Sequence, residues 1–274
     1  MGIRKPLIFE IAPDTYCINE FGLDAMYLLI GEEEALLVDT GCGVANVREV
    51  VAEITDKPYK VVLTHGHMDH VGGMYAFHEV YLNERDWKMA EAVSREETMQ
   101  YADMFGKGGG YGIYDYSPEQ ITEDRTLPKF LPLNDGAVFH LGGRDIKAYA
   151  IAGHTPGGIT LLDEKNRLMI SGDCCNVNLL APWCSVEETY QSLLKFQSLS
   201  DKFDQNFNGH VGYLGSTMNK SQPKSVCEDL LHICEEVLAG KGDPKPYQFL
   251  GVELQQISYG TAKLSYDPTR IREN

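Results

Sequence analysis

The segment from Thr64 to Gly73 carries the densest set of metal-ligand side chains in the sequence. It reads THGHMDHVGG and places three imidazoles and one carboxylate within six positions, at His65, His67, Asp69 and His70. Imidazole is the commonest protein ligand for zinc, and carboxylates bind zinc, iron and manganese. Four such groups would already fill the four coordination positions of one tetrahedral ion. The segment therefore indicates more than a single structural metal site.

Three further ligand types stand in separate short motifs. His154 lies in GHTPGG, Asp173 in SGD and His210 in NGH. Seven potential ligands indicate two ions that keep coordination positions open for water and substrate, which is the arrangement of a metal-assisted hydrolase. We therefore expect two divalent metal ions as cofactors, with zinc favoured over iron or manganese.

The spacing of the ligands predicts how they divide between two ions. His65 and His67 are two residues apart, so in extended backbone they point the same way and can chelate one ion. Asp69 and His70 follow after the chain begins to turn, which aims them at a second ion nearby. Asp173 follows a predicted strand and is the best candidate to bridge the ions, and His210 completes the second site.

The elements that must position these side chains are predicted from hydrophobic periodicity and turn residues. Ser185 and Glu188 form a capping-box pattern at the start of one helix, and the tail over 247–266 alternates well enough for one or two strands. Strands are predicted over residues 7–11, 16–18, 26–30, 35–38, 59–63, 137–141, 146–151, 159–162, 168–170 and 203–207, and helices over 44–54, 83–104, 186–196 and 226–238.

Strands in blocks, each followed by helices, predict an α/β fold in which two sheets face one another and helices cover the outer faces. The candidate ligands then lie at strand ends or in the turns after them, where loops can converge. We expect one domain over residues 1–274, within which residues 216–274 form a helix with short strands packed on it.

Composition limits the classes of function. The chain has 274 residues, 43% of them hydrophobic and 23% charged, which is ordinary for a globular protein. Its net charge of −16 argues against nucleic acid as a partner. The seven cysteines lack CxxC spacing, and no signal or transmembrane-length run is evident. We expect a cytoplasmic protein that acts on a small molecule without binding a membrane, and a homo-oligomer stays open.

The order of these motifs resembles the metallo-β-lactamase superfamily. That family carries a first aspartate, then H-x-H-x-D-H, then a later His, Asp and His, and all five elements occur here over roughly residues 7–215. The resemblance implies an αββα sandwich of two mixed sheets. It also implies a first metal on His65, His67 and His154, a second on Asp69, His70 and His210, a bridging Asp173, and an Asp39 that orients ligands without binding metal.

The motif GHTPGG and the segment from Ser185 to Leu194 resemble the glyoxalase II and lactonase branch of that family. No basic cluster suited to glutathione is evident, so we expect hydrolysis of a carboxylic ester, a thiolester or a lactone. Three alternatives stay open: a mononuclear iron sulfur dioxygenase of the same fold, a phosphodiesterase, and a metal-bearing protein that only binds its ligand.

The expected mechanism follows from two metal ions, which lower the pKa of a shared water so that hydroxide exists at physiological pH. Hydroxide would attack a carbonyl whose oxygen is polarised by a metal. Asp69 is predicted to act in catalysis by orienting this hydroxide or carrying its proton. Neither a serine nor a cysteine nucleophile is required.

Substrate contacts are predicted from aromatic residues near the motifs. Trp183 lies in the loop after Asp173, and Tyr213 follows His210 closely. Tyr111 and Tyr114 stand in a glycine-rich stretch that would suit either a lid over the site or a surface loop. The alternative role for each of these aromatics is packing.

Overall fold

The N-terminal half folds into a seven-stranded mixed sheet whose strands follow chain order. The computed structural model describes residues 2–211 and 220–273. The first four strands pair antiparallel and the later ones pair parallel. The strands are β1 (Leu7–Ala12), β2 (Thr15–Asn19), β3 (Ala25–Ile30), β4 (Ala35–Val38), β5 (Tyr59–Val62), β6 (Glu79–Leu82) and β7 (Lys129–Pro132).

A second sheet of five strands faces the first. It is mixed, because only β11 and β13 pair parallel. Between the sheets, Tyr27, Leu36 and Val62 pack with Leu161 and Ile170 in one buried cluster. In spatial order the strands are β13 (Gln205–Asn208), β11 (Leu168–Gly172), β10 (Ile159–Asp163), β9 (Asp145–Ala150) and β8 (Val138–His140).

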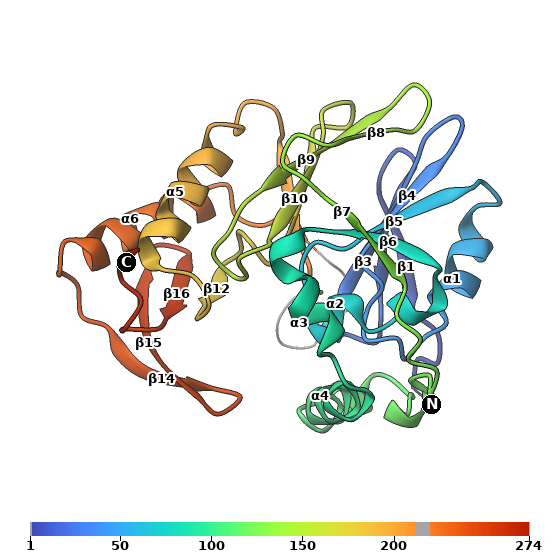
Figure 1. Ribbon diagram of the computed structural model, residues 1–274, viewed down its shortest axis with the longest axis horizontal. Coiled ribbons are helices and arrows are strands. Elements are labelled where there is room, and N and C mark those ends of the chain that lie inside the picture. The colour runs from blue at the N-terminus through green and yellow to red at the C-terminus, as the bar shows by residue number, and fades with distance from the viewer. Residues whose placement is uncertain (1, 212–219, 274) are drawn as a thin grey trace.

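Helices cover both outer faces, which confirms the predicted αββα sandwich (Figure 1). Strands β3 and β4 read AMYLLI and ALLV without polar alternation because both of their faces are buried. The α-helices are α1 (Val47–Ile54), α2 (Met68–Val71), α3 (Trp87–Glu91), α4 (Arg95–Lys107), α5 (Val186–Gln197) and α6 (Val226–Leu238). Short 3₁₀ turns are η1 (Met74–Ala76), η2 (Glu84–Asp86), η3 (Gly110–Gly112) and η4 (Pro118–Gln120).

Helix α5 begins where the sequence predicts. The Ser185 hydroxyl accepts a hydrogen bond from the backbone N–H of Glu188, which is the N-cap half of the predicted capping box. The carboxylate of Glu188 accepts a hydrogen bond from Arg85. The buried residues Leu193 and Phe196 of α5 then pack with Leu230 of α6 on the outer face of the second sheet.

The C-terminal strands form a third sheet, which the sequence did not predict. The tail makes three strands, β14 (Lys245–Phe249), β15 (Val252–Tyr259) and β16 (Ala262–Tyr266). The fourth strand, β12 (Asn178–Ala181), comes from the loop after Asp173 and pairs parallel with β16. Figure 1 shows the hairpin of β14 and β15 extending from this sheet towards α4.

The fold contains no helix suited to spanning a membrane among its described residues, and its thiols are buried. Within the described ranges, no helix combines the length and apolarity that crossing a bilayer requires. All seven cysteines are buried. Burial raises the pKa of the Cys174 thiol well above its usual value, as for a thiol that packs rather than reacts.

Candidate metal centre

The predicted ligands converge at one edge of the two facing sheets. Four of them follow β5, in a turn that leads into the short helix α2. His154 lies in the turn after β9, Asp173 directly follows β11, and His210 follows β13. Strands β4 and β5 run parallel in one sheet, and β11 and β13 run parallel in the other. The carboxyl ends of these strands therefore deliver their loops to a common site.

The ligand atoms cluster in the two predicted groups, one on each side of Asp173. His67 Nδ1 lies 2.8 Å from His154 Nε2. Asp173 Oδ2 lies 2.9 Å from His210 Nε2 and 3.6 Å from His154 Nε2, so this carboxylate is between the groups. Within each group the ligand atoms are no more than 4.8 Å apart, and the groups are His65, His67, His154 and Asp69, His70, His210. That these side chains hold metal stays a prediction.

The histidine rings are oriented by hydrogen bonds on the side away from the site. Their Nδ1 atoms contact protein oxygens: His65 with Thr64 Oγ1 at 3.0 Å, His70 with Asp39 Oδ2 at 3.0 Å, His154 with Leu180 O at 2.6 Å, and His210 with Leu23 O at 3.2 Å. Metal-binding histidines are held in this way, with the second ring nitrogen left for the ion.

Several buried ligand atoms have no hydrogen-bond partner among the described residues. They are Nε2 of His65 and His70 and Oδ1 of Asp173, whereas His67 faces His154 through Nδ1 and its unpartnered Nε2 is the opposite ring nitrogen. A buried polar atom without a partner is costly, so such atoms call for an ion or a water. Imidazole nitrogens and a carboxylate oxygen are also the donor types that divalent transition metals prefer. The residues therefore fit the group that the sequence predicts.

Burial and mutual repulsion keep part of the histidine cluster neutral. Burial, together with the charge that His154 would carry, lowers the pKa of His67 to about 3. Burial also lowers the pKa of His65 well below its usual value. A neutral imidazole keeps the lone pair that metal binding requires.

The second group carries paired charges. Burial opposes ionisation of His70, but the carboxylates of Asp69 and Asp39 outweigh it and raise the pKa of His70 to about 10. Burial would raise the pKa of Asp173, yet the neighbouring His210 and His154 hold it well below its usual value. The carboxylate of Asp173 is therefore ionised and can bind a cation.

Asp39 links the two groups from beneath. Its carboxylate accepts hydrogen bonds from Thr64 N at 2.7 Å and Thr64 Oγ1 at 2.8 Å, and it contacts His70 Nδ1 at 3.0 Å. Since the Thr64 hydroxyl donates to Asp39, its oxygen is left to accept the Nδ1–H of His65. Asp39 also has a φ of 62°, a conformation uncommon outside glycine and often found at functional sites.

Two further positioning residues were not predicted from the sequence. Tyr101 of α4 donates a hydrogen bond from its hydroxyl to Asp69 Oδ2 at 2.7 Å. The buried Asp86 accepts from Gly66 N at 3.0 Å, Thr155 Oγ1 at 2.6 Å and Gly157 N at 2.7 Å. Asp86 thereby joins the HGHMDH turn to the GHTPGG turn, and no local spacing signals that contact.

A second acidic group lies beneath the loop after β4. The ligand-type atoms of Glu20, Asp24 and Cys42 lie within 4.8 Å of one another and are buried. Glu20 accepts hydrogen bonds from Cys42 N at 2.7 Å and Ala45 N at 2.6 Å, so its carboxylate holds this loop in place. Burial raises the pKa of Glu20 to about 7 and that of Asp24 well above its usual value.

A cavity of about 250 Å³ opens directly above the predicted ligands. Its floor includes His67, Asp69, His154, Asp173 and His210. Its walls are mostly apolar and come from α4, from the loop before α5 and from the β14–β15 hairpin. Lys and Arg are absent from the described residues that line it.

Of the four aromatic residues predicted to contact substrate, the structure places one at the cavity and two away from it. Trp183 lines the cavity, with its ring centroid 4.5 Å from that of His67. The structure does not bring Tyr111 or Tyr114 to it, which corrects that expectation. Tyr114 is buried against Phe21, and its hydroxyl accepts a hydrogen bond from Asn19 Nδ2 at 3.0 Å. The Tyr111 hydroxyl donates a hydrogen bond to Asp103 on α4. Tyr213 lies outside the described residues.

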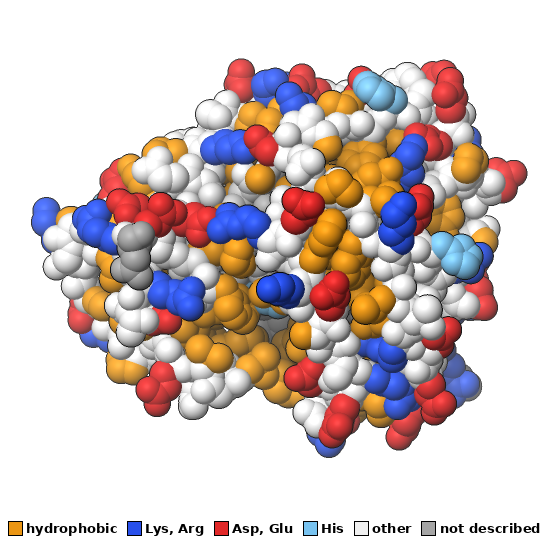
Figure 2. All heavy atoms as spheres, viewed as in Figure 1, with side chains coloured by type: hydrophobic (Ala, Val, Ile, Leu, Met, Phe, Trp, Pro, Cys, Tyr) orange, Lys and Arg blue, Asp and Glu red, His pale blue; other side chains and the backbone are white. Residues whose placement is uncertain are grey.

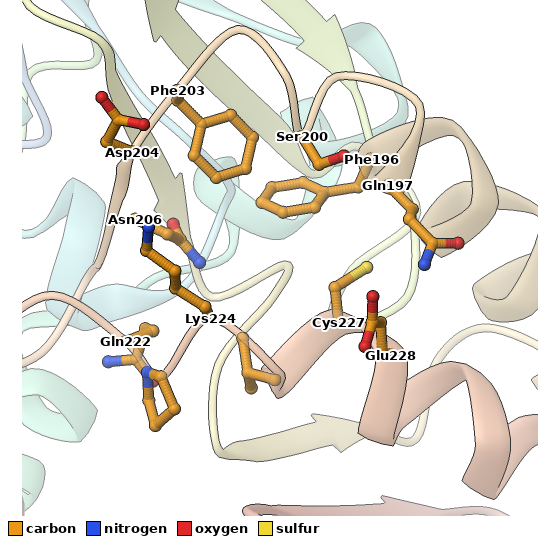
Figure 3. Close-up of a pocket in the computed structure, with 12 residues that line it drawn as sticks. Phe196, Gln197, Ser200, Phe203, Asp204, Asn206, Gln222, Lys224, Cys227 and Glu228 are labelled. Carbon is orange, nitrogen blue, oxygen red and sulfur yellow. The ribbon is translucent and has the colours of Figure 1, made fainter.

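A second cavity, of about 200 Å³, lies between the end of α5 and the start of α6 (Figure 3). Phe196, Phe203 and Cys227 turn towards it, with Lys224 and Glu228 nearby. None of the seven predicted ligands lines this cavity. The predicted metal ligands are thus found at the cavity over the histidines.

The comparisons with known proteins agree with this fold. Residues 21–174 match the sequence model of the metallo-beta-lactamase superfamily. A metallo-beta-lactamase family protein from Thermus thermophilus has a similar structure, with a TM-score of 0.57 and 22% identity, over 86% of this chain and 85% of that one. This similarity shows a shared fold.

Several curated relatives carry thioesterase names. The chain is 25% identical to the human protein named Acyl-coenzyme A thioesterase MBLAC2 over 244 residues, which cover 83% of this chain and 74% of that protein. It is also 25% identical over 200 residues to the Atrochrysone carboxyl ACP thioesterase of Aspergillus fumigatus, covering 72% of this chain and 53% of that protein.

Proposed function

The chain belongs to the metallo-beta-lactamase superfamily and is a hydrolase, and on that premise we propose that it hydrolyses an acyl thioester at a two-metal centre. The observation that carries the proposal is the convergence of five histidines and Asp69 around Asp173, where Nε2 of His65 and His70 and Oδ1 of Asp173 are buried without a hydrogen-bond partner among the described residues. His65, His67 and His154 would hold one ion, and Asp69, His70 and His210 the other, with Asp173 shared.

When bound, two such ions supply a water activated near neutral pH and a positive charge for the carbonyl oxygen. The chain's own residues complete the chemistry. Burial would raise the pKa of Asp69, but the neighbouring His70 and His210 outweigh it and lower that pKa. Asp69 is therefore a carboxylate that can orient the attacking water or take its proton. Tyr101 fixes one oxygen of Asp69, which leaves the other for that task.

The thioester is favoured over an ester or lactone by its leaving group as well as by the relatives' names. A thiol has a pKa of about 8.5, so it departs as a thiolate near neutral pH with little help from a proton donor. The described lining of the cavity offers no lysine or arginine for that purpose. A lining with neither lysine nor arginine among its described residues supports a leaving group that departs as a thiolate.

The test combines metal analysis with a substrate panel of thioester, oxygen ester, lactone and phosphodiester. We expect two metal ions per chain and the highest kcat/KM with the thioester. His154→Ala should lose turnover and metal, whereas His140→Ala, an exposed histidine paired with Asp145, should lose neither.

Two results would overturn the proposal. One iron per chain with uptake of oxygen would favour a sulfur dioxygenase. Two bound ions without hydrolysis of any panel member would favour a protein that binds its ligand without turning it over.

A further inference from the structure

The wall of the cavity opposite the predicted ligands is apolar and is built by parts of the chain outside the ligand motifs. We propose that this wall binds the aliphatic acyl chain of the substrate and that the β14–β15 hairpin sets the chain length that is accepted. The proposal rests on thioester hydrolysis as the reaction. It adds a binding surface and a substrate class that the ligand geometry does not supply.

Large apolar side chains are left exposed on this wall. Leu250 at the hairpin tip is 56% exposed, Phe105 of α4 is 39% exposed and Trp183 is 38% exposed, and all three line the cavity. Figure 2 shows apolar side chains gathered around the hollow on this face. Covering such a surface with an alkyl chain removes apolar area from water on both partners, which favours binding.

The hairpin turn itself is unusual. Phe249 pairs with Val252, so Leu250 and Gly251 form a two-residue turn, and both have positive φ, at 47° and 82°. Turns of this kind favour Asn, Asp or Gly at the first position, because a β-carbon is strained there. A leucine at this position is unfavourable for the turn, yet its side chain lines the cavity. Residues held in strained conformations gather at ligand-binding sites, and this one extends the apolar wall.

Charge argues for a neutral chain. Lys and Arg are absent from the described lining, so the wall offers no counter-ion to a charged acyl group. The polar wall residues Asn178 and Ser265 are few beside Leu180, Phe249 and Leu250. An uncharged aliphatic chain matches a wall that is mostly apolar and has no lysine or arginine among its described residues.

The experiment measures kcat/KM for acetyl, butanoyl, octanoyl and hexadecanoyl thioesters of one thiol. Each methylene that leaves water for the wall is expected to raise kcat/KM roughly 4-fold, until the cavity is full. Leu250→Asn is the informative variant, because asparagine suits the positive φ and removes the apolar contact. We expect the octanoyl-to-acetyl ratio to fall about 10-fold, a loss of the size that apolar pocket contacts produce.

Leu127→Asn is the matched control, since Leu127 is also an exposed leucine and does not line the cavity. Its octanoyl-to-acetyl ratio should equal that of the unchanged chain. A second readout does not depend on turnover: quenching of tryptophan fluorescence by octyl and butyl thioethers of N-acetylcysteamine. The octyl compound should bind more tightly, and Leu250→Asn should reduce the difference.

The outcomes separate the two proposals. Hydrolysis with no dependence on chain length would overturn the acyl site and leave thioester hydrolysis standing. No hydrolysis of any thioester, with octyl still bound better than butyl, would support the apolar site and overturn the reaction. An aromatic acyl thioester preferred over octanoyl would overturn the aliphatic assignment. Equal binding of both thioethers would overturn the site itself.

Discussion

The floor of the cavity is held by hydrogen bonds, whereas its wall is formed by apolar contacts. On the floor, the rings of His70, His154 and His210 are each fixed by a hydrogen bond on the far side, and the cluster is buried. On the wall, Phe105 and Leu250 make apolar contacts and remain partly exposed. Rigid placement suits chemistry that depends on geometry, whereas apolar surface tolerates chains of different length.

The largest expected effect is on the floor, from His67→Ala. This change removes one of the three imidazoles in the first group, and we expect turnover to fall below detection for acetyl and octanoyl thioesters alike. Metal content should fall as well, while circular dichroism shows the fold retained. A loss confined to long acyl chains would contradict the separation of floor from wall.

The floor could be predicted from the sequence because its chemistry is local. His65, His67, Asp69 and His70 lie within six positions, and the later ligands stand in turns with recognisable glycines. Strand alternation and turn residues likewise indicated two facing sheets.

The supporting contacts could not be predicted in this way. Tyr101 reaches Asp69 across 32 positions, and Asp86 reaches Gly157 across 71. Apart from Trp183, the wall was missed for the same reason, since β12 comes before α5 and is paired with a strand near the C-terminus. Short apolar stretches such as β12 carry too weak a pattern to show their partner strand.

Asp39→Asn is expected to give the next largest effect. The amide cannot accept hydrogen bonds from Thr64 and His70 at both oxygens, so both ligand groups lose orientation. We expect metal affinity to fall about 10–100-fold, the usual loss when a ligand's supporting partner is changed. Competition with a chelator measures it, with Asp145→Asn as an exposed control. Unchanged affinity would show that the floor does not depend on Asp39.

The buried acid pair beside the floor predicts a dependence of stability on pH. Burial raises the pKa of Glu20 from 4.5 to about 7 in the folded chain. The folded state therefore holds a proton that the unfolded state releases, and stability falls as pH rises from about 4.5 through 7. The slope from one such group is about 1.4 kcal/mol per pH unit.

Glu20→Gln removes the titration and keeps one of the two oxygens that accept hydrogen bonds from the backbone N–H groups of Cys42 and Ala45. We expect urea unfolding of the metal-loaded variant to show a shallower loss of stability over the same pH range. Equal slopes in both chains would mean that Glu20 does not carry the proton. The Glu20 carboxylate holds the loop that contains Cys42 and Ala45. This measurement therefore tests how that loop stabilises the floor, and it leaves the wall residues unchanged.

Tyr101→Phe gives the smallest expected effect and tests where floor and wall meet. The Tyr101 ring packs on Phe105 with centroids 4.5 Å apart, and its hydroxyl donates to Asp69, so one residue contacts both regions. Phenylalanine keeps the packing and removes the hydrogen bond, a change of about 1 kcal/mol, or roughly 5-fold in rate. If floor and wall act separately, kcat falls by that factor for every acyl chain, and the octanoyl-to-acetyl ratio is unchanged.

Loss of the hydrogen bond should also raise the pKa of Asp69 and move the acid limb of the kcat profile to higher pH. A changed ratio with an unmoved acid limb would instead assign Tyr101 to the wall.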